Sequence, residues 1–276
     1  MGGSAFIWLG SIIAMAMCTM AMTGAERGGS STFERLRREL DRLHASHGTV
    51  EPLAGSALPK MFPAYDWFTV TFRQFPVARM MPPPLKASNV FAVPHADREP
   101  LLISSIDRLR DFFRDRLPQI HTLERAREAA RAWLEGATAL HQDGFYRFTI
   151  EEDSIKAQSI EGRIEVSGKA IAMRGGNGAI TAALAFDNVG RLHSATDSPD
   201  LHPGPRPICQ ATKLLDPDPI VRKIAEQDLL IMGTAAKSYL DEVRMEANRE
   251  LRRAIDELWG RISREDCPAV PPRARP

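Results

Sequence analysis

His141, Asp143 and Tyr146 are close enough in the sequence to act as one chemical group. A histidine can take up or release a proton near neutral pH, and a carboxylate can orient its ring. Trp133 lies on the predicted helix that ends near His141 and Asp143, and it could supply an apolar wall. We therefore predict a small-ligand pocket at Trp133, His141, Asp143 and Tyr146, suited to binding or hydrolysis. The alternative for His141 is a favourable interaction with the dipole at the end of a helix.

The residue patterns of common catalytic and metal centres are absent from the chain or incomplete. It contains no His-Glu-x-x-His and no Gly-x-Ser-x-Gly, and the loop at 162–170 has five residues between its glycines where a phosphate loop has four. His44 and His47 have a spacing that can bind a metal, but no third ligand is near them in the sequence. The consecutive acids at 151–153 fall in a predicted connection between strands and point in different directions, which favours solvated side chains. We predict no catalytic residue, no metal and no cofactor.

A helix followed by a sheet should position the candidate pocket. Thr122 can cap a helix whose apolar side chains step by four, three, four and three residues: Ala126, Ala130, Trp133, Ala137 and Leu140. Strand patterns follow at 145–150, 163–173, 179–186 and 191–196. Turn residues between the strands favour an antiparallel meander. This element order resembles the cystatin and NTF2-like folds, and the resemblance implies a scaffold that hosts pockets, enzymes and dimer interfaces alike.

The residues before this helix indicate a further helix and short strands. Ser31-Thr32-Phe33-Glu34 forms a capping box that predicts a helix ending at His47. Phe68, Val70 and Phe72 alternate with polar residues, which is typical of a half-buried strand. Shorter strands are predicted at 89–93 and 101–103, and Ser104 or Ser105 can cap a helix that stops at Pro118.

The C-terminal part of the chain has the clearest helical pattern. Asp218 suits an N-cap, Pro219 suits the first helical position and Gly233 suits the C-terminal cap, so a helix is predicted at 219–232. Its expected buried face contains Val221, Ala225, Leu229 and Met232, widened by Ile220 and Ile224. Thr234 and Asn248 are expected to cap two further helices, packed as antiparallel neighbours.

Asp218-Pro219-Ile220-Val221-Arg222, followed by Ala225, Leu229, Gly233, Ala236 and Leu240, resembles a HEAT-like α-solenoid unit. The resemblance covers residues 216–262, whereas a stacked array usually needs about three copies. It implies contact with a protein partner or a packing role, and no chemistry. Arg222 and Arg253 are our candidates for a partner surface. The alternative is a helical cap on the preceding domain.

The N-terminal residues suggest export from the cytoplasm. Ala5 to Met22 form an apolar run, and we expect a removable signal within residues 1–25. The alternative is an uncleaved membrane anchor at 5–22, although Met1 to Ser4 carry no Lys or Arg. In an oxidising compartment Cys209 and Cys267 could form a disulfide around the C-terminal helices, contributing roughly 4 kcal/mol. The alternative is that Cys209 and Cys267 remain two separate thiols.

The composition fits a globular protein. It is 43% hydrophobic with a net charge of +1, which provides no field for nucleic acid. The predicted fold class is α+β: an α+β domain at 26–203, a Pro-rich linker at 204–209, a HEAT-like helical module at 210–264 and a disordered tail at 265–276. Our first hypothesis is an exported, non-enzymatic protein, periplasmic or secreted, whose module binds a protein or caps the domain. The alternative is ligand binding or hydrolysis in the α+β domain.

Overall fold

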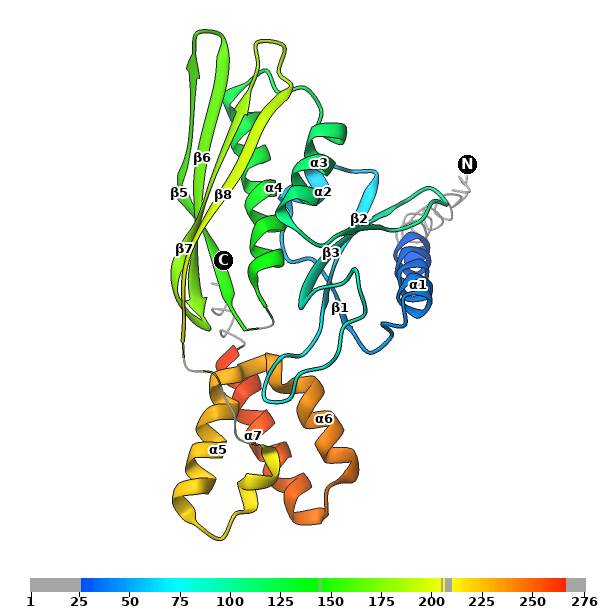
Figure 1. Cartoon of the computed structure of the whole chain (residues 1–276), viewed down its shortest axis with the longest axis vertical. Coiled ribbons are helices and arrows are strands. Elements are labelled where there is room, and N and C mark those ends of the chain that lie inside the picture. The colour runs from blue at the N-terminus through cyan, green and yellow to red at the C-terminus, as the bar shows by residue number, and fades with distance from the viewer. Residues whose placement is uncertain (1–25, 144, 205, 207–209, 267–276) are drawn as a thin grey trace, which may run out of the picture.

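The computed structural model describes residues 26–143, 145–204, 206 and 210–266. Within them the chain forms helices and two antiparallel sheets of four strands each, so the predicted α+β class is confirmed (Figure 1). The helices are α1 (Glu26–Arg42), α2 (Ala57–Met61), α3 (Ile106–Arg116), α4 (Leu123–His141), α5 (Pro219–Met232), α6 (Lys237–Glu246) and α7 (Arg249–Asp266), with 3-10 turns η1 (Ala211–Leu215) and η2 (Gly233–Ala236). The strands are β1 (Thr49–Pro52), β2 (Tyr65–Thr71), β3 (Ser88–Pro94), β4 (Leu101–Ile103), β5 (Arg147–Ile160), β6 (Arg163–Arg174), β7 (Gly176–Phe186) and β8 (Leu192–Pro203).

Helix α4 lies at the centre of the molecule, between the two sheets (Figure 1). Thr122 caps it by accepting a hydrogen bond from the Arg125 amide at 3.2 Å, as predicted. Its residues from Ala132 to Ala137 are all buried, because β5, β6 and β7 cover one side and α2 and β3 the other. One core therefore runs from the first sheet through α4 to the second.

The first sheet has the order β1-β2-β3-β4 and is covered on both faces. Phe68 and Val70 belong to the same apolar cluster as Leu36 and Leu40 of α1, while Trp67 belongs to the central core. The predicted strand forms, and its Phe68, Val70 and Phe72 face is buried under α1, as the alternation indicated. The opposite face, which was expected at the solvent, is also buried at Thr69, next to Trp67 of the central core.

The expected capping box at 31–34 was also wrong. Helix α1 begins at Glu26 and ends at Arg42, before the predicted end at His47. Thr32 therefore lies inside the helix, where its hydroxyl donates to the Asp66 carboxylate at 2.7 Å. Ser31, which the local pattern had assigned to the N-cap, also lies inside the helix and so cannot cap its start.

The second sheet is the predicted meander, with the order β5-β6-β7-β8. Ile180, Ala182, Leu184 and Phe186 are buried on its inner side, as the alternation predicted. Its outer side is exposed at Glu165, Thr181 and their neighbours. The acids at 151–153 lie within β5, at an irregularity in its pairing with β6, and not in a connection between strands.

The helical module, defined as residues 210–266, has an apolar cluster of its own that includes Leu229, Leu240 and Ile255. Its first helix has the predicted ends: Asp218 accepts from the Ile220 amide at 2.8 Å, and Gly233 ends the helix with φ of 58°. Asn248 accepts from the Leu251 amide at 2.9 Å, as its predicted capping role requires.

Three details of the module differ from the prediction. Ile220 and Ile224 are 68% and 45% exposed, because the buried stripe of α5 is narrower than expected. Thr234 does not cap a helix but lies within η2, which continues directly into α6. Helix α7 extends to Asp266, past the expected start of a tail at 265.

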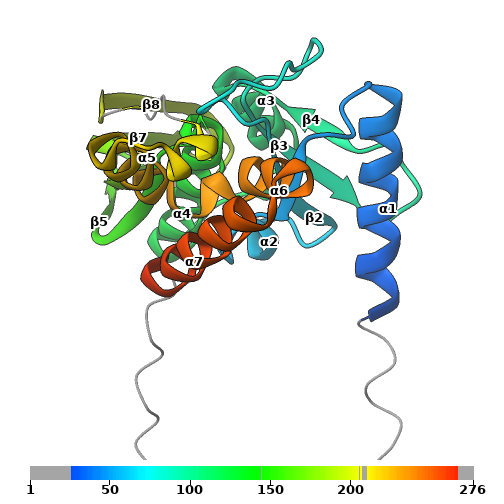
Figure 2. The same ribbon diagram turned by 90° about the horizontal axis from the view of Figure 1, so that it is seen from below.

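The module packs against the end of the body, defined as residues 26–203, at which β8 ends (Figure 2). Phe75 and Phe145 of the body join the module's apolar cluster. Glu242 of α6 accepts hydrogen bonds from Arg73, at 2.9 Å, and from Arg79. The module thus shares both apolar and charged contacts with the loop that follows β2.

Candidate functional site

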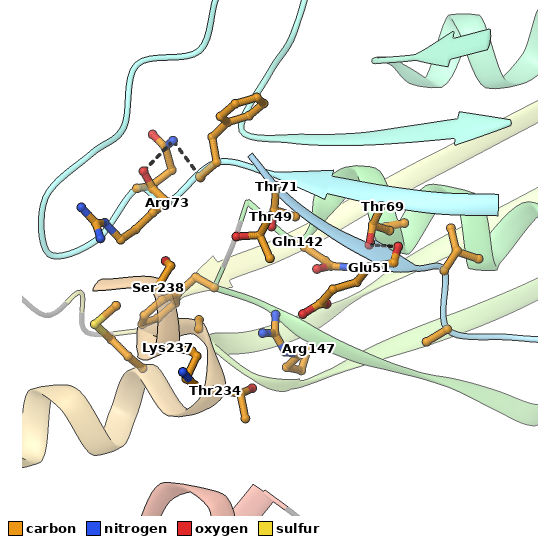
Figure 3. A pocket seen from close by; sticks show the side chains of 18 of the residues that line it. Thr49, Glu51, Thr69, Thr71, Arg73, Gln142, Arg147, Thr234, Lys237 and Ser238 are labelled. Atoms are coloured by element: carbon orange, nitrogen blue, oxygen red, sulfur yellow. Dashed lines mark hydrogen bonds between the residues drawn. The ribbon is translucent and has the colours of Figure 1, made fainter. Parts of the chain in front are cut away.

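A pocket of about 550 Å³ lies where the first sheet, the end of α4, the start of β5 and the module meet (Figure 3). Its volume is within the range of small-molecule sites. The body contributes Thr49, Glu51, Pro52, Leu53, Ala54, Thr69, Thr71, Phe72, Arg73, Gln74, Phe75, Glu135, Thr138, Ala139, Gln142, Phe145, Arg147 and Phe148, and the module contributes Met232, Thr234, Ala235, Lys237, Ser238 and Asp241. The pocket therefore requires both parts of the chain.

The polar wall of the pocket is formed by β1 and β2. Trp67, Thr69 and Thr71 alternate along β2, so they lie on one face of the sheet. Trp67 is buried in the core, and the face becomes polar where it leaves the core and enters the pocket. The register pairs Thr69 with Glu51 and Thr71 with Thr49, which places these four side chains together.

Four of the charged groups that line the pocket are engaged by the protein itself. Arg73 donates to Glu242 at 2.9 Å, and Lys237 forms an ion pair with Asp241 one turn further along α6. Glu135 of α4 accepts from the backbone amides that begin α2, at 2.8 to 3.0 Å. These groups are held in place by the fold.

Three further polar side chains, Glu51, Gln142 and Arg147, point into the same part of the pocket (Figure 3). Arg147 donates to the Tyr146 carbonyl oxygen at 3.1 Å. Beyond that bond, none of the three side chains has a hydrogen-bond partner among the residues that the structure describes. They come from β1, the end of α4 and β5, so three separate elements bring them together.

The electrostatic environment of Arg147 is mixed. Loss of contact with water lowers the pKa of its guanidinium, the Glu51 carboxylate raises that pKa, and Arg174 lowers it. Arg174 faces Arg147 in the register of β5 and β6. An arginine retains its charge at neutral pH even so, which leaves a partly desolvated cation at the pocket wall.

None of the four residues predicted for a ligand pocket lines this one. Trp133 is fully buried in the central core. His141 contacts Asp197 of β8 at 2.8 Å. Asp143 accepts from Arg206 at 3.2 Å, and Tyr146 lies beside the same guanidinium, whose centre is 5.3 Å from its ring. Their sequence neighbours Gln142, Phe145, Arg147 and Phe148 do line the pocket.

Asp143, Tyr146 and Arg206 form a small cluster at the joint between body and module. The Arg206 guanidinium lies 4.0 Å from the centre of the Phe145 ring. Burial raises the pKa of the Asp143 carboxyl, while Arg206 opposes that change, and burial also raises the pKa of Tyr146. These contacts hold Arg206 beside the start of β5.

The remaining candidates lie on the surface or outside the described ranges. Arg222 donates to the carbonyl oxygens of Asp216 and Pro217, and Arg253 pairs with Glu257 on the exposed side of α7. Cys209, Cys267 and the apolar segment 5–22 lie outside the described residues. Among the residues that are described, no group of three His, Cys, Asp or Glu side chains could hold a metal, and no helix has the length and hydrophobicity of a membrane span.

Sequence reasoning missed Glu51, Gln142 and Arg147 as a group. The one local signal of a pocket was the run Trp67-x-Thr69-x-Thr71. On this face of the strand, apolar Trp67 is followed by two polar residues. Pairing with β1 then determines that Glu51 lies beside it. No spacing along the chain connects these positions to Gln142 and Arg147.

Comparisons with protein-family models, with curated proteins and with solved structures find no match to this chain.

Proposed function

We propose that this chain is an exported, non-enzymatic binding protein that holds a small polar molecule in the pocket between its body and its helical module. The observation that carries the proposal is the set of Glu51, Gln142 and Arg147, which face the pocket without side-chain partners in the described part of the chain. Gln142 and Arg147 are half-buried and Glu51 is exposed, so all three side chains are accessible to a ligand. A ligand with matching donors and acceptors would replace their contacts with water by direct hydrogen bonds. The module then serves as one wall of the site.

A pocket-filling variant tests this proposal. Thr71→Trp places an indole in the pocket wall, whereas Thr181→Trp makes the same change on the exposed outer side of the second sheet. Saturation-transfer NMR with a library of small polar fragments should detect binders for the wild type and for Thr181→Trp that Thr71→Trp loses. Binders that Thr71→Trp retains would place the ligand elsewhere, and a wild type without binders would overturn the proposal.

A protein partner for the module is the second candidate, favoured by an exposed apolar row on α5. Ile220, Ile224 and Ile231 are spaced by four and seven residues and are 68%, 45% and 48% exposed. In-cell crosslinking should then capture a partner that a double Ile220→Ser, Ile224→Ser variant loses. Capture that is insensitive to this variant, and to Arg222→Gln with Arg253→Gln, would exclude the module as its binding surface.

A further inference from the structure

We infer that the ligand is a small molecule that carries both a carboxylate and a hydrogen-bond donor, as amino acids and hydroxy acids do, with the carboxylate on Arg147 and the donor on Glu51. The inference rests on the proposed function and names the chemical class that the pocket would take. It depends on which polar side chains of the pocket wall have no side-chain partner in the described part of the protein and can therefore bond to a ligand.

The first step is the pairing of charges around the pocket. Six charged side chains line it: Glu51, Arg73, Glu135, Arg147, Lys237 and Asp241. Arg73, Glu135, Lys237 and Asp241 each have a partner within the protein, as described above. One positive and one negative group remain, Arg147 and Glu51, and no ion pair joins them in the structure. Their charges are therefore open to a ligand placed between them.

The second step is the chemistry of Arg147. A guanidinium presents its donors in a planar fork that matches the two oxygens of a carboxylate. Burial strengthens such a bond, because the local dielectric is lower than that of water. Arg174 lies opposite Arg147 in the register of β5 and β6. This end of the pocket thus favours an anionic group.

The third step is the presence of Glu51 in the same pocket. Glu51 is exposed to water, and an ionised carboxylate only accepts hydrogen bonds, so the ligand group that contacts it must be a hydroxyl or an ammonium group. It also repels a second negative charge, which disfavours a doubly charged phosphate. Gln142 can donate or accept beside both groups. A ligand with one carboxylate and one donor can bond to all three side chains, whereas a simple anion offers no donor to Glu51.

Calorimetric titration of the full chain tests the inference with four classes of probe. These are the standard amino acids, 2-hydroxy acids such as lactate, carboxylates without a donor such as propionate, and inorganic phosphate. We expect at least one amino or hydroxy acid to bind, and Arg147→Gln to weaken that binding at least about tenfold. Glu51→Gln should weaken the binding of probes that carry a donor by about tenfold. It should leave the binding of propionate unchanged or make it slightly tighter.

Matched variants control for loss of structure. Arg163→Gln makes the same change as Arg147→Gln at an exposed position of β6 and should leave binding unchanged. Arg147→Lys retains the charge without the fork and should weaken binding even if Arg147→Gln unfolds. Each variant is accepted only if its circular dichroism and urea midpoint show a folded chain.

The outcomes separate this inference from the proposed function. If the polar fragments bind in a way that Thr71→Trp abolishes, but no amino or hydroxy acid binds, the ligand class is wrong and the pocket proposal stands. Binding of these acids that is indifferent to Arg147 and Glu51 also overturns the inference, as does tighter binding of phosphate. If neither fragments nor acids bind the wild type, both proposals fail.

Discussion

Glu135 caps a helix that begins 78 residues earlier in the chain. Its carboxylate accepts from the Ala57 amide with both oxygens at 3.0 Å and from the Leu58 amide at 2.8 Å. Ser56 precedes α2 but forms no side-chain cap, so the distant carboxylate replaces the usual local one. Because Glu135 is 7% exposed, these charge-assisted bonds are protected from water.

The carboxylate has room only because residue 55 is glycine. Its φ is +135°, and a Cβ there would lie 2.4 Å from Cδ of Glu135. We predict that Gly55→Ala lowers the free energy of unfolding by about 3 kcal/mol, from backbone strain together with displacement of the cap. Urea denaturation followed by circular dichroism measures the change.

The control for this substitution is Gly162→Ala. Gly162 has a φ of +79°, and no atom lies within 4 Å of its Cβ position. Gly162→Ala therefore introduces backbone strain without a steric clash, and we expect it to lower the free energy of unfolding by about 1 kcal/mol. Equal losses at the two positions would show that contact with Glu135 contributes nothing.

At the level of elements, α4 is organised by small side chains. Ala126, Ala129, Ala130 and Ala132 are fully buried around Trp133, and Gly136 allows Leu109 of α3 to approach. Small residues let two sheets pack close to one helix, and close packing leaves little space for larger groups. The period-four-and-three pattern indicated one buried stripe, whereas the helix is buried nearly all round because it lies between two layers.

A larger side chain on α4 should therefore destabilise the protein. Ala130→Leu is expected to lower the free energy of unfolding by about 1 to 3 kcal/mol through overpacking. Arg127→Leu, at an exposed position of the same helix, should change it by no more than about 0.5 kcal/mol. Thermal and urea unfolding of both variants measure this, and a tolerant Ala130 would contradict the close packing of the central layer.

At the level of the whole molecule, charged contacts fix the module against the body. Glu242 of α6 accepts from Arg79 and Arg73, both in the loop after β2. Burial raises the pKa of Glu242, but the two arginines outweigh this effect and hold the pKa below its ordinary value of 4.5. Since the folded state has the lower pKa, ionised Glu242 stabilises it above about pH 4.5, and this contribution is lost as the pH falls through the folded pKa.

This linkage predicts a pH-dependent effect of Glu242→Gln. The variant should be less stable than the wild type near pH 7, and the difference should shrink as the pH falls below about 4.5. Urea midpoints over this range measure it. Glu257→Gln, in an exposed pair with Arg253, is the control and should differ little from the wild type. A difference for Glu242→Gln that is constant with pH would contradict the role of its charge.

Local patterns in the sequence were sufficient for several elements. Thr122, Asp218 and Asn248 cap the helices that they were expected to cap, and the meander of the second sheet follows its turn residues. Caps and turns depend on neighbours within a few residues, so the sequence alone contains the information that specifies them. The α+β class follows from these elements.

The candidate site was decided by tertiary structure alone. Glu51 lies far in the sequence from Gln142 and Arg147, and it meets them only because β1 pairs with β2 beside the end of α4 and the start of β5. The exposure of Ile220 and the burial of Thr69 were likewise unpredictable, because periodicity identifies a face of an element without identifying what covers it. Contacts between distant segments determine which layers of the fold pack together. The pocket lies where the first sheet, the end of α4, the start of β5 and the module do not pack tightly against one another.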